Sequence, residues 1–116
     1  MSRQKRKPLS PWATAKPDGM EKRFVQIGDS LAYHPAWLDL SAGAKVLYLY
    51  MCMESGGKNE FKIPQKVYSR FTDRRAFHRA KNELICAGFI EIVHNGANTR
   101  TENIYRFCFD WKSRSP

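Results

Sequence analysis

Four side chains that can form hydrogen bonds with DNA bases lie close together in one segment: Arg74, Arg75, His78 and Asn82. On a helix that turns roughly 100° per residue, Arg75, His78 and Asn82 fall on one face, and Arg74 flanks it. Arginine can form two hydrogen bonds with guanine in the major groove, and asparagine can do so with adenine. The spacing therefore predicts a helix face that contacts the bases of DNA.

Other polar side chains around this face predict contacts with phosphates. Arg79 and Lys81 flank the face, and Thr72 stands at the expected start of the helix. Such contacts position a protein on a duplex but do not read its sequence. The set expected at the DNA backbone is Lys62, Lys66, Arg70, Thr72, Arg79, Lys81 and Arg100, the last of these near the tip of an expected hairpin.

The net charge of +9 is concentrated in two segments. Residues 1–23 carry a net charge of +5 and residues 58–81 carry +6, whereas residues 24–57 carry −2 and residues 82–116 are neutral. A basic domain of this size usually binds a polyanion, most often nucleic acid and less often an anionic membrane surface. A solvated basic surface without a partner is the alternative that the composition leaves open.

The three cysteines, Cys52, Cys86 and Cys108, indicate neither a disulfide framework nor a zinc site. Their number is odd, their spacing is wide, and no Cys-x-x-Cys pair occurs. Reduced, buried cysteines in a cytoplasmic protein are the simpler expectation.

The sequence lacks the patterns of catalytic and cofactor sites. His34, His78 and His94 are scattered without metal-ligand spacing, and neither a glycine-rich phosphate loop nor a nucleophile motif occurs. No apolar run approaches the ~18 residues that a membrane-spanning helix needs. We therefore expect a protein that is not an enzyme, holds no metal or cofactor, and has no membrane partner.

Apolar periodicity and capping residues predict the secondary structure. Ser41 and Thr72 are the expected N-caps of two helices, and Gly56-Gly57 should end the first of them. Apolar residues on nearly every face of that first helix predict that it is buried. Trp37 is an expected core anchor. The expected elements are a strand at 24–27, a short helix beginning at Pro35, a helix at 42–54, a strand at 61–63, a short helix at 64–70, a longer helix at about 73–87, and strands at 89–93 and 104–109.

The spacing and faces of these elements predict how the domain is assembled. The helices at 64–70 and 73–87 are separated by only one or two residues, which is typical of a helix-turn-helix. The polar segment 94–103 contains Asn-Gly and should join two strands as a hairpin loop. The inner face of the longer helix is expected at Ala76, Phe77, Ala80, Leu84 and Ala87, and one face of the last strand at Tyr105, Phe107, Phe109 and Trp111.

These residues resemble the winged helix-turn-helix superfamily, and more narrowly the small winged-helix and replication-initiator-like proteins of bacterial mobile elements. The resemblance covers about residues 24–111. It implies that the helix at 73–87 enters the major groove and that Arg100 in the hairpin wing touches the flanking backbone. The turn Ser69-Arg70-Phe71-Thr72 departs from the family pattern, which often has a small residue or glycine there. The matching stretches are Phe24-Val25-Gln26-Ile27, His34-Pro35-Ala36-Trp37 through Leu40-Ser41, Ala44-Lys45-Val46-Leu47-Tyr48, and Arg79-Ala80 through Leu84 to Gly88-Phe89-Ile90.

The expected organisation is a basic N-terminal arm at 1–23, one winged-helix domain at 24–111 with helices packed on a small antiparallel sheet, and a short tail at 112–116. The expected function is sequence-specific binding of double-stranded DNA, as a transcriptional regulator or a replication-associated factor of a bacterial mobile element. The alternative is a non-enzymatic protein-interaction module in a replication or transfer complex. A homodimer or a protein partner is compatible with either function.

Overall fold

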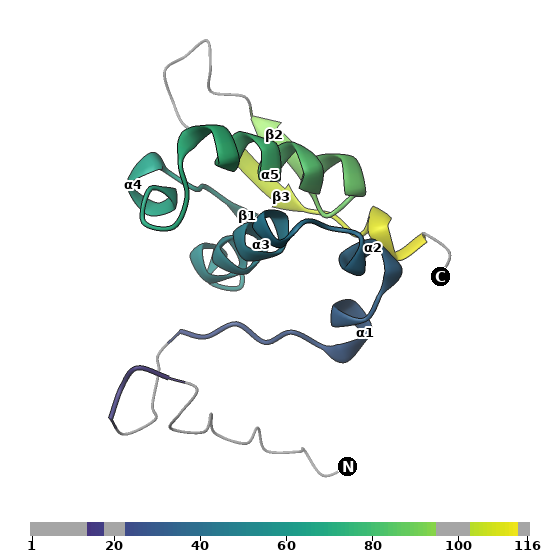
Figure 1. Ribbon diagram of the computed structural model, residues 1–116, viewed down its shortest axis with the longest axis horizontal. Coiled ribbons are helices and arrows are strands. Elements are labelled where there is room, and N and C mark those ends of the chain that lie inside the picture. The colour runs from purple at the N-terminus through teal and green to yellow at the C-terminus, as the bar shows by residue number, and fades with distance from the viewer. Residues whose placement is uncertain (1–13, 18–22, 95–102, 114–116) are drawn as a thin grey trace.

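The computed structural model describes residues 14–17, 23–94 and 103–113, in which helices pack against a small antiparallel sheet (Figure 1). The expected α+β class is confirmed. No helix within these ranges is long and apolar enough to cross a membrane. In chain order the elements are α1 (Asp29–Ala32), α2 (Pro35–Leu38), α3 (Ala42–Ser55), β1 (Glu60–Phe61), α4 (Gln65–Tyr68), α5 (Arg74–Ala87), β2 (Ile90–His94), β3 (Ile104–Phe107) and a 3-10 helix (Asp110–Ser113).

Local capping explains where α2 and α3 begin and end. Pro35 occupies the first position of α2, where its missing N–H costs nothing. The His34 Nδ1 atom accepts a hydrogen bond from the Ala36 N–H. The Ser41 hydroxyl oxygen accepts a hydrogen bond from the Ala44 N–H at 3.2 Å. Gly56 ends α3 in the left-handed region at φ 59°. The predicted caps of α3 are confirmed, and the helix runs one residue beyond its predicted end.

The start of α5 differs from the sequence prediction. Asp73, not Thr72, is the N-cap, because its Oδ1 accepts a hydrogen bond from the Ala76 N–H at 2.7 Å. Both residue types are good N-caps, so the residue pattern alone could not choose between neighbours. The carboxylate has the added advantage of facing the positive end of the helix dipole. The helix therefore begins one residue later than predicted.

The strands lie in the order β1-β3-β2, and both neighbouring pairs are antiparallel. β3 ends at Phe107, so the predicted strand at 104–109 is too long. After Phe107 the Cys108 N–H still donates to the Phe89 carbonyl, and the chain then enters the 3-10 helix, where the Trp111 N–H donates to the Gly88 carbonyl. Phe109 is consequently exposed, whereas Trp111 is buried from within the 3-10 helix.

Residues 24–27 are not assigned to a strand, so the strand predicted there is wrong. Their apolar residues are only partly covered, and they line a hollow rather than pairing with the sheet. This open hollow, of about 420 Å³, is lined by Val25, Ile27, Leu49, Tyr50 and Met53. The apolar pattern of Val25 and Ile27 indicates that these side chains are partly buried. It does not show whether their backbone pairs with a neighbouring strand, and here it does not pair.

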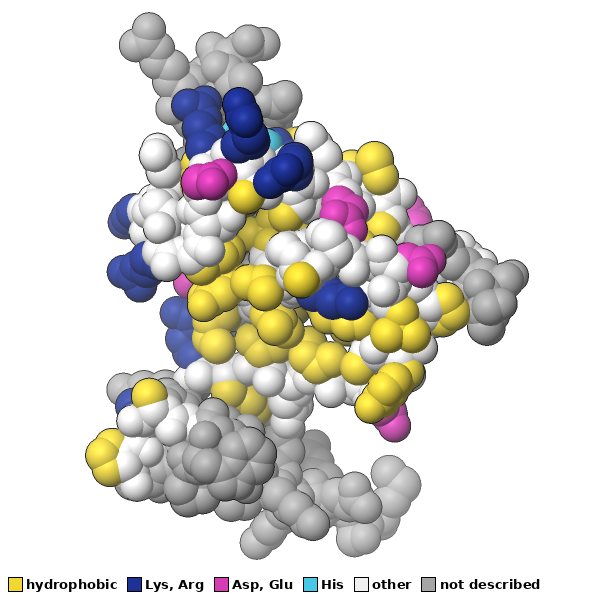
Figure 2. Space-filling view, viewed as in Figure 1, with side chains coloured by type: hydrophobic (Ala, Val, Ile, Leu, Met, Phe, Trp, Pro, Cys, Tyr) yellow, Lys and Arg dark blue, Asp and Glu magenta, His cyan; other side chains and the backbone are white. Residues whose placement is uncertain are grey.

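The outer side of α3 is exposed, which corrects the expectation that this helix is buried on nearly every face. Val46, Leu49 and Tyr50 remain accessible, with Tyr50 at 42%. Figure 2 shows hydrophobic side chains gathered across the middle of this side of the molecule. The reason is that α5 and the sheet cover α3 from one side only, where Ala44, Leu47 and Met51 are buried.

An aromatic cluster joins the helices to the sheet. Trp37 is buried and packs edge-on against Tyr48 and Phe89, which confirms its predicted role as a core anchor. Trp111 stacks on Phe89 at 5.3 Å between ring centroids and so closes this end of the core. The rings come from α2, α3 and the segments that flank β2 and β3, and they therefore fix the sheet relative to the helices.

Gly88 should be essential for this packing, and alanine at this position should destabilise the domain. Gly88 has φ 86°, and a Cβ there would lie 2.8 Å from Asp110 Cβ and 3.0 Å from the backbone nitrogen of Trp111. Gly57 has the same φ of 86° but no atom within 4 Å of its Cβ position, so Gly57→Ala measures backbone strain alone. We expect Gly88→Ala to lose roughly 1–3 kcal/mol more than Gly57→Ala in urea denaturation, because of overpacking. Equal losses would contradict the close approach of the 3-10 helix.

Candidate nucleic-acid interface

The inner face of α5 is held against the domain as its periodicity predicts. Phe77, Ala80 and Leu84 are buried. Phe77 also stacks on Tyr68 of α4 with 4.1 Å between ring centroids and an interplanar angle of 11°. Because α5 is fixed to both α3 and α4, the direction of its opposite face is set by the core.

The outer face of α5 carries the predicted base-contacting residues together. Arg74, Arg75, His78 and Asn82 are all exposed. Among the described residues, the side chains of Arg75 and Asn82 form no hydrogen bond and no ion pair. Figure 2 shows Lys and Arg side chains gathered at the end of the molecule where α5 begins. These side chains are therefore available to an external partner.

The acidic groups nearest this face are engaged elsewhere. Asp73 caps the start of α5. Glu83 turns toward α3, where its two carboxylate oxygens accept hydrogen bonds from the Ser41 N–H at 2.6 Å and the Ser41 hydroxyl at 2.7 Å. The positive charge of the outer face is therefore not neutralised by Glu83, the only acidic residue within α5. Sequence reasoning missed the Ser41–Glu83 link, because no local pattern connects residues 42 positions apart.

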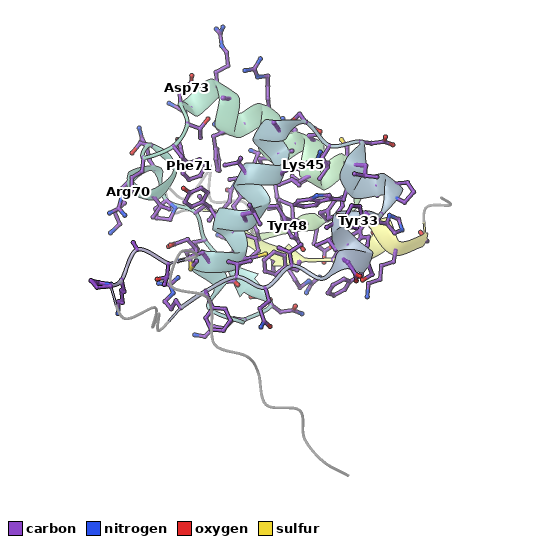
Figure 3. All side chains as sticks on the ribbon, turned by 60° about the horizontal axis from the view of Figure 1, so that its bottom comes forward. Tyr33, Lys45, Tyr48, Arg70, Phe71 and Asp73 are labelled. Atoms are coloured by element: carbon purple, nitrogen blue, oxygen red, sulfur yellow. The ribbon has the colours of Figure 1, made fainter. Side chains whose placement is uncertain are left out.

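The cations expected at phosphates upstream of α5 lie on neighbouring elements. Lys62, Lys66 and Arg70 are exposed, and Thr72 is half-buried. Figure 3 shows Arg70 extending outward from the end of α4, while Phe71 turns toward the domain. Phe71 stacks on Tyr50 of α3 with 4.0 Å between ring centroids, so an aromatic contact fixes the turn in place of a glycine.

Lys81 does not lie where the sequence prediction placed it. Only 9% of this residue is exposed, and its Nζ lies 3.1 Å from His78 Nδ1. The reason is its position roughly 120° around the helix from Arg75 and beside the buried Phe77. Arg79, on the other flank, is exposed as expected.

The electrostatic environment favours a neutral His78. Burial, then the positive charges of Lys81 and Arg74, lower the pKa of His78 below its ordinary value. Burial also lowers the pKa of Lys81. These effects favour the neutral form of His78, and the exposed positive charge of this face comes from its arginines.

The predicted wing contact lies outside the described residues. Arg100 belongs to the segment 95–102, which joins β2 to β3. These two strands pair antiparallel, with His94 opposite Ile104 at their open end. The described strands thus place the ends of this segment side by side, as a hairpin requires.

The cysteines are free thiols, and Cys86 corrects the expectation that all three are buried. Cys86 is exposed on α5, whereas Cys52 and Cys108 are half-buried. Burial raises the pKa of the Cys52 thiol to about 11, so it is protonated at neutral pH. No group of three or more His, Cys, Asp or Glu side chains in the described ranges is arranged to hold a metal ion.

Comparisons with known proteins give no family: no protein-family model, no curated protein and no solved structure matches the chain. The geometry and charge of α5 and its neighbours are therefore the basis for proposing a function.

Proposed function

We propose that this protein is a winged helix-turn-helix protein that binds double-stranded DNA through α5. The observation that carries the proposal is the exposed face of Arg74, Arg75, His78 and Asn82, on a helix whose opposite face is fixed in the core. The element order α3-β1-α4-α5-β2-β3, with the sheet order β1-β3-β2, supports the winged-helix assignment. In such a fold, α5 is the recognition helix and the segment between β2 and β3 is the wing.

The geometry suggests a division of roles on the duplex. Arg75 and Asn82 lie on one line of α5 and carry groups that suit guanine and adenine edges in the major groove. Lys62, Lys66 and Arg70 lie on the elements before α5 and would meet phosphates, which fixes the position of the helix without reading sequence. A role as a transcriptional regulator or a replication-associated factor of a bacterial mobile element follows from the resemblance to those proteins.

The proposal predicts that Arg75→Ala and Asn82→Ala each relax DNA specificity while leaving the fold intact. A preferred duplex is first selected from random sequence, and its affinity is then compared with that of a scrambled duplex. Loss of one good base contact should reduce the discrimination by roughly 1–3 kcal/mol. Lys112→Ala is the matched control, because this exposed cation lies in the 3-10 helix, away from the outer face of α5. Full discrimination in both folded α5 variants would refute the assignment of the recognition face.

A protein-interaction module is the second candidate, and the exposed apolar side of α3 favours it. Val46, Leu49 and Tyr50 are accessible there, and the last two line the open hollow together with Val25 and Ile27. The outer face of α5 argues the other way, because an interaction helix should expose apolar groups and this one exposes cations. The two functions can be distinguished with Leu49→Ala and with a double variant that combines Arg74→Ala and Arg75→Ala. Duplex DNA binding that is kept in Leu49→Ala and lost in the double variant would favour the DNA function over the protein-interaction function.

A further inference from the structure

Lys81 differs from the other cations of α5 because it is buried, which suits a contact with another residue of the protein. Its side chain is almost wholly covered, and its amine meets the imidazole of the residue three positions earlier, with 3.1 Å between Lys81 Nζ and His78 Nδ1. Arg75 and Arg79, by contrast, are exposed. Lys81 as a whole residue is therefore less accessible to a phosphate than Arg75 and Arg79 are.

The contact with Lys81 determines which nitrogen of His78 carries the proton. A lysine ammonium has three hydrogen-bond donors and no acceptor, so His78 Nδ1 must act as the acceptor. A neutral imidazole that accepts at Nδ1 carries its proton on Nε2. The exposed His78 ring then offers one hydrogen-bond donor to a partner, and this donor is the Nε2–H group.

We propose that Lys81 is a positioning residue that holds His78 in its Nε2–H tautomer, so that His78 donates to an acceptor atom on the bound nucleic acid. Guanine N7 and O6, adenine N7 and thymine O4 are acceptors of this kind in the major groove. The tautomer itself is a property of the free protein. Only the identity of the acceptor rests on the proposed DNA binding.

The charges around His78 agree with this arrangement. Within the described ranges, the charged groups that affect His78 are Lys81 and Arg74, both on α5, and no titratable group of α3, α4 or the sheet contributes. Protonation of His78 would remove the acceptor from Nδ1 and place a second cation against Lys81. The contact should therefore be present above the pKa of His78 and lost as the pH falls through it.

Lys81→Met tests the proposal in the free protein, because methionine keeps an unbranched apolar stem for the covered site. Long-range proton–nitrogen NMR spectra distinguish the protonated from the unprotonated imidazole nitrogen. Wild type and Lys81→Arg, which keeps a donor without an acceptor, should show His78 with its proton on Nε2. In Lys81→Met the preference should weaken and the pKa of His78 should rise. Arg79→Met removes a charge of the same helix that is not among the charges lowering the pKa of His78, and it should change neither property. An unchanged tautomer and pKa in Lys81→Met would overturn the proposal.

Duplex binding separates a positioning role from phosphate contact. Arg79→Met should reduce the slope of log K against log salt by about 0.9, as expected for one lost phosphate contact. Lys81→Met should leave the slope unchanged and reduce affinity for a preferred duplex by roughly 2–10-fold, as one lost hydrogen bond would. A slope reduced as in Arg79→Met would make Lys81 a phosphate ligand and overturn the proposal. If no duplex binds at any salt concentration, the proposed function fails, and the imidazole spectra still decide the role of Lys81.

Discussion

Replacing Leu84 with alanine should remove a large part of the stability of the domain. Leu84 is 0% exposed, lies on the inner face of α5 and belongs to the buried cluster that α3 and α5 share with the sheet. Truncating a buried leucine costs about 2–5 kcal/mol, through lost burial and the cavity that remains. Small domains are stable by only about 5–15 kcal/mol. Urea denaturation followed by circular dichroism should therefore show a much lower midpoint, or no folded baseline.

Cys86→Ala is the matched control for this prediction. Cys86 lies two residues further along the same helix, but its side chain is exposed. Alanine has a high helix propensity, so this substitution should change the midpoint little. A Leu84→Ala variant with the same midpoint as Cys86→Ala would show that the inner face of α5 has been placed wrongly.

The local features of this fold could be read from the sequence because each depends on a few adjacent residues. Ser41 and Gly56 bound α3 through hydrogen bonds and backbone angles that act over one helical turn. Periodicity predicts the inner and outer faces of α5, because apolar residues such as Leu84 and polar residues such as Arg75 recur on opposite sides of the helix. Helical periodicity also predicts that Arg75, His78 and Asn82 lie on one face, and in the structure all three are exposed.

The features that the sequence did not reveal depend on contacts between distant segments. Residues 24–27 have the composition of a strand, but only the assembled sheet shows that they do not pair with it. The side chain of Glu83 is directed by Ser41, far away in the sequence. The sequence predicts that Lys81 contacts the DNA backbone, but the residue is buried on the flank of α5 beside Phe77. Periodicity gives the direction of a side chain but not how deeply its surroundings cover it.

Duplex DNA binding should weaken steeply as salt increases, and this is the largest effect that the proposed function predicts. If ~5–8 phosphates are neutralised, log K should fall against log salt with a slope of about −4.5 to −7. Between 50 and 200 mM salt the affinity should therefore fall by roughly 10³–10⁴-fold. The exposed cations on α5 and on the elements before it supply charges for such contacts, together with the basic arm at 1–23. Titration of one labelled duplex at several salt concentrations measures the slope directly.

Two comparisons show which part of the chain produces the slope. Arg74→Ala combined with Arg75→Ala should reduce its magnitude by up to about 1.8 if both side chains reach phosphates, and by less if Arg75 contacts a base instead. Deleting residues 1–20, which hold five Lys and Arg residues, should weaken binding to preferred and scrambled duplexes alike, because phosphate contacts carry no sequence information. Single-stranded DNA of equal length should give a shallower slope, at about 0.7 rather than 0.9 per phosphate. A flat salt response, or the absence of binding at low salt, would leave the cations of α5 without a polyanionic partner, and the exposed apolar side of α3 would become the better guide to function.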